Sequence, residues 1–219
     1  MEYELFLRYG PALLRGFGVT LLCWVAGSIG GLLLGFVLAV LYRWAGRWLG
    51  VLLQAYIEVI RNTPFMIQLF ILYYGGPHVG LVLSPVQAGI LSFVVYGSPY
   101  FAEIFRSGFN AIPPGQIEAA RCVGLAEASI MRRIILPQML MLITAPLTNF
   151  VIILSKETAI LSIVTVPELL YETQTMAAET FTYVEPFLVL SVCYWLLVIA
   201  TARLGRAVES RATRHLKRA

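Results

Sequence analysis

The sequence predicts an all-α integral membrane protein that forms one transmembrane domain over its 219 residues. Hydrophobic residues make up 59% of the chain and charged residues only 13%, whereas soluble domains carry about 25% charged residues. The mean hydropathy of +0.80 agrees with this balance and excludes a disordered chain and a soluble enzyme. Long stretches without a formal charge are the third observation, because a helix needs about 20 apolar residues to cross a bilayer.

Five stretches of the chain are long and apolar enough to be transmembrane helices. The expected spans are residues 14–42, 52–76, 86–107, 134–156 and 185–204. The second and third would otherwise form one apolar run of twice the required length. Glycine and proline at 75–77 and the Ser84-Pro85 step separate them, because such residues interrupt helices.

The distribution of Lys and Arg predicts which side of the membrane each segment faces. With the N-terminus outside, thirteen of the sixteen basic residues lie in cytoplasmic segments, and only Arg8, Arg15 and Lys156 lie outside. Cytoplasmic segments are the ones enriched in Lys and Arg. We therefore expect a multi-pass protein of the cell (inner) membrane, with its C-terminus in a basic cytoplasmic tail at 205–219.

The segment between the fourth and fifth spans, residues 157–185, contains five Glu and neither Lys nor Arg. Glu168, Glu172, Thr175 and Glu179 follow one another at steps of four, three and four, which places them on one face of a helix. Apolar residues fall largely on the other face, so we expect a short amphipathic helix on the outer surface. The acidic face is either simply solvated or a docking surface for an external partner, and the sequence leaves both open.

The connector between the third and fourth spans, residues 110–133, is the most informative part of the chain. A Pro-Pro-Gly turn at 113–115 ends one helix, and another is expected over 116–122. Gly124 then allows a sharp bend, after which the chain is helical again. By themselves, these residues describe either a structured cytoplasmic helical loop with a role or a plain connector.

The spacing in this connector resembles a signature of the permease subunits of bacterial ABC importers. Its positions are filled by Glu118, Ala119, Ala120, Gly124, Ile134, Leu136 and Pro137. The resemblance implies the type I permease fold of ABC importers, with a coupling loop that docks on a separate ATPase subunit. Under it, the ATPase-coupling residues are Glu118, Ala119, Ala120, Gly124 and Pro137.

Further motifs narrow the resemblance to permeases for polar amino acids, of the histidine, glutamine and arginine type. These motifs begin at Arg61, Tyr100, Ile112, Leu136, Lys156 and Val166, and the resemblance covers residues 16–202. The sequence departs from the family at Glu157, where many members carry Asp, and at Ala159, where Ser is usual. The implied function is the transmembrane subunit of an ATP-driven importer that moves polar amino acids across the cell membrane by alternating access. Glu157 and the acidic segment mildly favour a cationic substrate, while the identity of the amino acid stays open.

The resemblance also implies the other parts of the transporter. These are two copies of an ATP-binding subunit, a second permease copy in a homo- or heterodimer, and an extracytoplasmic solute-binding protein. The two lysines of the chain, Lys156 and Lys217, do not follow the glycines of a Walker A loop. We therefore expect no enzymatic activity and no cofactor in this chain, with ATP and Mg²⁺ on the partner subunit, and no nucleic-acid partner.

Polar residues within the predicted spans are candidates for contacts with the transported substrate, because a charge at the bilayer centre costs about 2.5–3.5 kcal/mol. The candidates are Thr63, Gln68, Asn149, Lys156 and Glu157. Lys156 and Glu157 end the fourth span, where they either bind the carboxylate and amino group of an amino acid or anchor the helix at the interface. The alternative role of the three neutral candidates is a hydrogen bond that helps helices to pack.

Other functional classes fit the sequence less well. A secondary carrier would need titratable groups at mid-depth and usually a longer, internally repeated chain, whereas the spans here contain no Asp. The charged residues Glu103 and Arg106, near the inner end of the third span, are expected to pair within one helix. An intramembrane enzyme or a metal site would need a set of ligands or nucleophiles that His78 and His215, in an outer loop and the tail, do not form. An ABC importer permease for another small polar solute, such as a sugar or an inorganic anion, is the main alternative.

Overall fold

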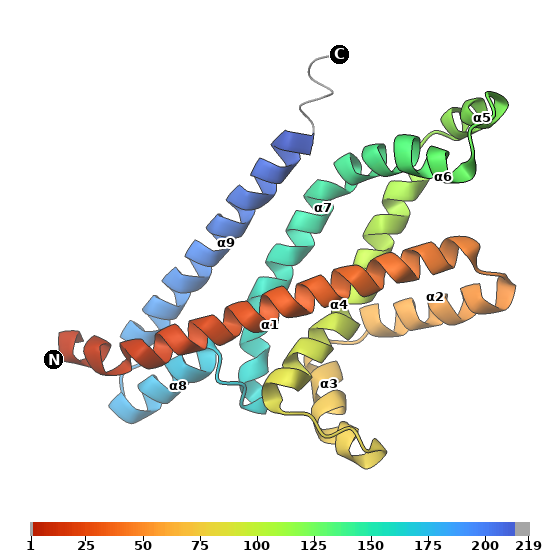
Figure 1. Ribbon diagram of the computed structural model, residues 1–219. Helices are drawn as coiled ribbons and strands as arrows, with labels where there is room; N and C mark the ends of the chain where they lie inside the picture. Colours follow the sequence, from red (N-terminus) through yellow and green to blue (C-terminus); the bar gives the residue numbers. More distant parts are fainter. Residues whose placement is uncertain (1, 213–219) are drawn as a thin grey trace.

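The computed structural model describes residues 2–212, with side chains from 8 to 210, and every regular element in that range is helical. The α-helices in Figure 1 are α1 (Glu2–Trp44), α2 (Arg47–Arg61), α3 (Phe65–Phe70), α4 (Pro85–Asn110), α5 (Pro114–Cys122), α6 (Glu127–Ile130), α7 (Leu136–Glu157), α8 (Leu169–Thr180) and α9 (Val184–Ala212). Two π-helical turns cover Ile71–Gly75 and Met131–Ile135, and two 3-10 turns cover Gly76–Val79 and Thr158–Val164. This architecture confirms the fold class. The end of the predicted basic tail, with His215 and Lys217, lies outside the described residues.

Four helical segments of the described chain are long and apolar enough to cross a membrane. They are Arg8–Trp44, Pro85–Asn110, Glu127–Val164 and Val184–Ser210. These segments contain the first, third, fourth and fifth spans expected from the sequence. Their surfaces carry exposed apolar side chains, among which Leu33 on α1 and Trp195 on α9 are each 62% exposed. Apolar surface of this extent is compatible with lipid as the surrounding medium.

The expected second span, residues 52–76, is interrupted, so the structure has one continuous span fewer than the five expected. α2 ends at Arg61, and the backbone leaves the helical region at Pro64, where ψ is 140°. Proline has no backbone N–H to continue the hydrogen bonds of the helix, and it disfavours a helical backbone conformation in the residue before it. The 15 residues of α2 extend only about 22 Å at 1.5 Å per residue.

The start of α4 follows the expected Ser84-Pro85 step. The hydroxyl oxygen of Ser84 accepts from the backbone N–H of Gln87 at 3.4 Å, and the Gln87 side-chain oxygen accepts from the N–H of Ser84 at 3.0 Å. These reciprocal bonds form a capping box, and Pro85 occupies a first-turn position where its missing N–H is not needed.

The core lies where α1 crosses α4, and glycines let these two helices approach closely (Figure 1). A Cβ added to Gly27 would lie 2.4 Å from the Cβ of Phe93, and one added to Gly35 would lie 2.6 Å from the Cβ of Phe101. Small residues on one helix face permit such contact between membrane helices. Phe101 also meets Phe150 of α7 edge-on, with ring centroids 4.8 Å apart. α1, α4 and α7 thus form one packed unit.

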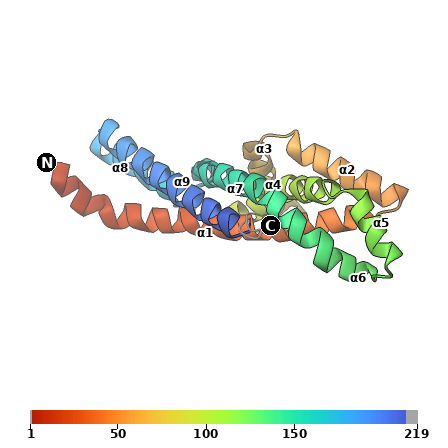
Figure 2. The same cartoon turned by 90° about the horizontal axis from the view of Figure 1, so that it is seen from above.

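The connector helices and α8 lie at opposite ends of α7. α5 and α6 precede α7 in the chain, whereas α8 follows it after the 3-10 turn, and both views place them far apart (Figures 1 and 2). The short helix expected around 168–179 is present as α8. A second apolar cluster holds α8 to α1, and its buried members are Tyr9, Leu13, Leu169 and Met176.

Candidate functional site

α5 and α6 form a bent helical elbow at the place of the predicted coupling loop. Pro114 occupies the first turn of α5. Gly124 has a φ of +77°, in the left-handed region that glycine adopts without strain. The N–H of Gly124 donates to the carbonyl of Arg121 at 2.9 Å, and the N–H of Leu125 donates to the carbonyl of Ala120 at 3.1 Å. These two bonds close the end of α5 in a Schellman motif, so the bend that the sequence suggested at this glycine is confirmed.

Four of the five predicted coupling residues lie together on this elbow. Glu118, Ala119 and Gly124 are exposed, while Ala120 is buried at 5%. Pro137 is exposed in the first turn of α7. An open hollow of about 510 Å³ lies beside the elbow, and its lining residues are Gln116, Ala119, Ala120, Val123, Leu125, Arg133, Ile134 and Gln138. The elbow therefore presents a small-residue surface beside a hollow, a shape that can receive a partner.

Two polar contacts fix the orientation of the elbow. Arg121 Nε donates to Glu127 Oε1 at 2.6 Å and Nη2 donates to Oε2 at 3.3 Å, which makes a two-point pair across the bend. The hydrogen bond to Glu127 raises the pKa of Arg121. Gln138 Nε2 donates to Gln116 Oε1 at 2.7 Å and joins α5 to the first turns of α7. Exposed ion pairs contribute only about 0–1 kcal/mol to folding stability. These contacts therefore affect the orientation of α5 relative to α6 and α7 more than the stability of the fold.

Thr63 and Gln68, two of the predicted substrate residues, lie at the break between α2 and α3. Gln68 Nε2 donates to the carbonyl of Ile60 at 2.8 Å and to the hydroxyl of Thr63 at 2.8 Å. The first bond satisfies the carbonyl that Pro64, which has no N–H, leaves without a helical partner. Gln68 Oε1 is buried and accepts no hydrogen bond from the described residues. Both side chains line a mostly apolar cavity of about 270 Å³, so the cavity carries polar groups at one side of an otherwise apolar lining.

The other three predicted substrate residues lie near the end of α7. Lys156 and Glu157 are its last two residues, and Asn149 lies about two turns earlier. Lys156 and Asn149 are exposed, whereas Glu157 is half-buried and close enough to Tyr96 of α4 to act on its hydroxyl electrostatically. Among the described side chains, no hydrogen bond or ion pair joins this group to Gln68. The five candidates therefore come from two parts of the chain, the break between α2 and α3 and the end of α7, with no polar contact between them among the described residues.

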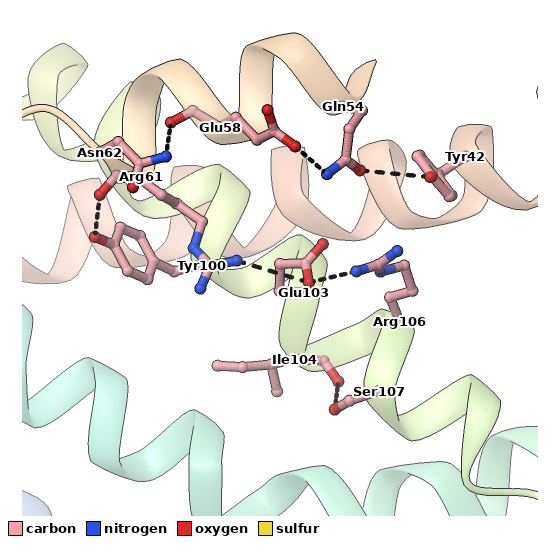
Figure 3. Close-up of polar contacts among 10 residues, drawn as sticks. All are labelled: Tyr42, Gln54, Glu58, Arg61, Asn62, Tyr100, Glu103, Ile104, Arg106 and Ser107. Atoms are coloured by element: carbon pink, nitrogen blue, oxygen red, sulfur yellow. Dashed lines mark hydrogen bonds and ion pairs between the residues drawn. The ribbon is translucent and has the colours of Figure 1, made fainter. Parts of the chain in front are cut away.

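A polar network joins the end of α2 to α4, and the sequence predicted only part of it (Figure 3). Arg106 Nη2 donates to Glu103 Oε2 at 2.7 Å, which confirms the expected intrahelical pair. Arg61 Nη1 lies 3.7 Å from the same carboxylate oxygen. The guanidinium carbons of Arg61 and Arg106 lie 5.4 and 5.3 Å from the ring centroids of Tyr100 and Tyr42, respectively, distances typical of cation–π contacts. The available signal was that Arg61 and Glu103 each stand in a motif of the family resemblance.

This network borders an open polar cavity between α2 and α4, with a volume of about 370 Å³. Its lining residues are Gln54, Ile57, Glu58, Arg61, Asn62, Tyr100, Glu103 and Arg106. Pockets that bind small molecules have volumes of about 300–1,000 Å³. The lining contains two arginines and two glutamates, so its formal charge sums to zero.

Glu168 is fully buried at 0% exposure, which corrects the prediction that it belongs to an outer acidic face. Its carboxylate caps α8 by accepting the N–H groups of Leu170 at 2.9 Å and Tyr171 at 2.8 Å. The hydroxyls of Thr20 on α1 and Tyr194 on α9 also donate to it, each at 3.4 Å. Burial raises the pKa of Glu168 to about 7. Because a capping residue lies outside the helix, its side chain does not follow the face that helical spacing assigns to it.

Comparisons with known proteins agree with the geometry. Residues 31–214 match the family model for the binding-protein-dependent transport system inner membrane component. The "Putative glutamine transport system permease protein GlnP" of Rickettsia bellii (strain RML369-C) is 34% identical over 213 residues, covering 95% of this chain and 98% of the relative. The arginine transport system permease protein ArtQ of Bacillus subtilis (strain 168) is 32% identical over 202 residues, which are 92% of each chain. The crystal structure of an amino acid ABC transporter with histidines has a TM-score of 0.87 at 31% identity, covering 94% of this chain and 96% of that chain. The chain therefore belongs to the family of inner membrane components of binding-protein-dependent transport systems, as its motifs indicated.

Proposed function

We propose that this chain is the transmembrane subunit of an ATP-driven importer that moves polar amino acids across the cell membrane by alternating access. The observation that carries the proposal is the full-length similarity to permeases named for glutamine and arginine transport. One of these amino acids is neutral and the other is cationic, so the proposal names polar amino acids as a class. A permease for another small polar solute is the second candidate, and a secondary carrier the third.

The shape of the elbow supports a role in coupling. Glu118 and Ala119 form an exposed surface on α5, and Gly124 sets the direction of the chain that follows. In the proposal, this surface docks on an ATP-binding subunit, and that subunit binds ATP and Mg²⁺. The Gln138–Gln116 hydrogen bond ties α5 to α7, so a displacement of the elbow would be passed to a membrane-spanning helix.

The substrate path of the proposal runs along α4. Tyr96, Tyr100 and Glu103 follow one another at steps of four and three, and therefore share one helix face. Gln68 contributes a buried acceptor without a partner in the described chain, and Glu157 contributes a half-buried carboxylate near Tyr96. The remaining predicted contacts, from Thr63, Lys156 and Asn149, belong to the same proposal. A second permease copy, identical or closely related, would complete the path.

The proposed topology places α8 and the N-terminus outside and the elbow in the cytoplasm. It is supported by the positions of the basic residues. An external solute-binding protein would then dock on the side of α8. A tag placed after Ala219 should be accessible only from the cytoplasm, and a tag placed before Glu2 only from outside. Access to both tags from one side would contradict this topology.

Reconstituted transport tests the function directly. The chain would be co-expressed with an ATP-binding subunit and a solute-binding protein from the same genome and placed in liposomes that contain ATP. We expect uptake of labelled L-glutamine or L-arginine that requires both partners and ATP, and no uptake of a labelled sugar. Sugar uptake would favour the second candidate. Amino-acid uptake driven by a proton gradient without ATP would favour a secondary carrier.

A further inference from the structure

The polar cavity between α2 and α4 is lined by charged side chains of both signs (Figure 3). Glu103 and Arg106 lie within one of the candidate membrane spans. Ionisable groups inside a span normally pair or face a water-filled cavity, and they are functional candidates for that reason. The path proposed above includes Tyr100 and Glu103 on the α4 side of this cavity, but it assigns no role to Glu58, Arg61 or Arg106.

Two charged side chains of the cavity are not committed to other groups. The guanidinium of Arg61 donates no hydrogen bond to any described residue, and the ion pair to Glu103 is loose at 3.7 Å. The carboxylate of Glu58 accepts one hydrogen bond, from Gln54 Nε2 at 2.7 Å, and has no ion pair within the described chain. Glu58 and Arg61 are three residues apart on α2, a spacing at which such residues often pair. They do not pair here, which leaves one cation and one anion available in the lining of the same cavity.

The available arginine is also restrained. The ring of Tyr100 lies 5.4 Å from the Arg61 guanidinium carbon. Arg106 donates to Glu103 at 2.7 Å. Because this second guanidinium already neutralises the Glu103 carboxylate, Arg61 is not required as its counter-ion. A restrained side chain loses less conformational entropy when it binds a ligand. Guanidinium groups bind carboxylates through two parallel hydrogen bonds, and such charge-assisted bonds are among the strong ones in proteins.

We propose that this cavity is a binding station for an amino-acid zwitterion, in which Arg61 receives the α-carboxylate and Glu58 receives the α-ammonium. The proposal rests on the proposed import of amino acids. The station would recognise the two groups that all amino acids share and would leave side-chain selection to residues elsewhere. It lies on the same α4 face as Tyr96, whose ring centroid is 5.1 Å from that of Tyr100, so it is continuous with the path proposed above.

Equilibrium binding tests the station without interference from the solute-binding protein. The complex with its ATP-binding subunits is purified in nanodiscs without nucleotide, and binding of radiolabelled L-glutamine is measured. The α-amide of glutamine lacks the carboxylate, and N-acetylglutamine lacks the ammonium, so competition by each compound reports one end of the ligand. In the wild-type complex, both competitors should bind about tenfold or more weakly than glutamine, a difference of about 1.4 kcal/mol per decade.

Variants then assign each end of the ligand to a residue. R61Q should bind glutamine about tenfold more weakly and lose the discrimination against the α-amide, while E58Q should lose the discrimination against N-acetylglutamine. R61K should keep the charge but show an intermediate loss, and it replaces R61Q if that complex does not assemble. The matched control is R47Q, which changes an arginine at the other end of the same helix, outside the cavity, and should bind like the wild type.

The outcomes separate this proposal from the function on which it rests. Wild-type import together with unchanged discrimination in R61Q and E58Q overturns the station but leaves the importer intact. Loss of the discrimination in K156Q and E157Q instead would assign recognition to the end of α7 and likewise overturn the station. Wild-type import without measurable binding of glutamine by the complex alone would also overturn the station and leave the importer intact. No import of any amino acid by the wild-type complex would overturn the proposed function and the station with it.

Discussion

Replacing Gly124 by Ala is expected to uncouple the transporter without unfolding it. Gly124 has a φ of +77°. For a residue with a side chain, the left-handed backbone conformation costs roughly 1–2 kcal/mol of free energy. A Cβ at this position would meet nothing within 4 Å, so the cost arises from the backbone and not from a clash. If the cost falls on the bent form of the elbow, the population of that form decreases relative to alternative forms by a factor of about 5–30.

The assay for this prediction is substrate-stimulated ATP hydrolysis by the reconstituted complex. We expect stimulation and uptake to decrease in Gly124→Ala, by up to the factor above, while basal hydrolysis and the amount of assembled complex stay near wild type. Gly115→Ala is the matched control, because Gly115 lies in the same elbow, has equally open surroundings and has no positive φ. Gly124→Asn should retain more coupling than Gly124→Ala, since Asn tolerates the left-handed region better. Equal coupling in the two alanine variants would refute the reasoning.

Three further predictions concern packing, pH and the substrate. Gly35→Ala should destabilise the protein by about 1–3 kcal/mol, because its Cβ would lie 2.6 Å from the carbonyl oxygen of Ser98; thermal unfolding should show little change for Gly18→Ala, where nothing lies within 4 Å. Burial raises the pKa of Glu168 from its ordinary value of 4.5 to about 7, so folding stability should decrease as the pH rises through this window and level off above it. Glu168→Gln should remove that slope in thermal unfolding measured at several pH values, and persistence of the slope would contradict this assignment. Glu157→Gln should lower uptake several-fold, and more for arginine than for glutamine, because the proposed hydrogen bond to a cationic group of the substrate, worth about 1.5–3 kcal/mol when charge-assisted, would become a neutral one. Unchanged uptake would identify Glu157 as an interfacial anchor.

The features that the sequence predicted well depend on residues close together in the chain. The bend of the elbow requires only that the residue after the end of α5 adopt a positive φ, and the glycine at position 124 is visible in the sequence. The break before α4 at the Ser84-Pro85 step is local in the same sense. The long apolar runs likewise predicted four of the membrane-spanning segments, because apolar length is itself the requirement for crossing a bilayer.

The interruption of the second span was missed because hydropathy and backbone geometry conflict at Pro64. The residues on both sides of the break are apolar, so their average hydropathy is that of a continuous span. Gln68 resolves the conflict in the folded chain, since its amide donates to the carbonyls of Ile60 and Thr63 across the break. A proline flanked by polar residues three or four positions away was the available signal.

The candidate site was predicted less well than the fold, because its contacts join distant parts of the chain. The ion pair between Arg61 and Glu103 connects α2 to α4, and no spacing rule relates residues so far apart in sequence. Glu168 was assigned to an outer acidic face by helical periodicity, although it precedes the helix and its partners include Thr20 on α1. In both cases the side chain responds to tertiary neighbours that a single sequence does not specify.

The elbow is placed so that one displacement can act on both ends of the proposed path. α4 ends at Asn110 and α5 begins at Pro114, so the elbow follows directly from the helix that carries Tyr100 and Glu103. On its other side, the elbow continues into α7, the helix that ends in Glu157. A rigid shift of the elbow, braced by its two polar contacts, would therefore move the α4 wall of the zwitterion station relative to α2. It would also move the carboxylate at the far end of α7, because a helix transmits axial displacement along its length. Alternating access in this chain then requires no separate linkage between the coupling surface and the substrate path, since α4 and α7 carry residues of the path and adjoin the elbow directly.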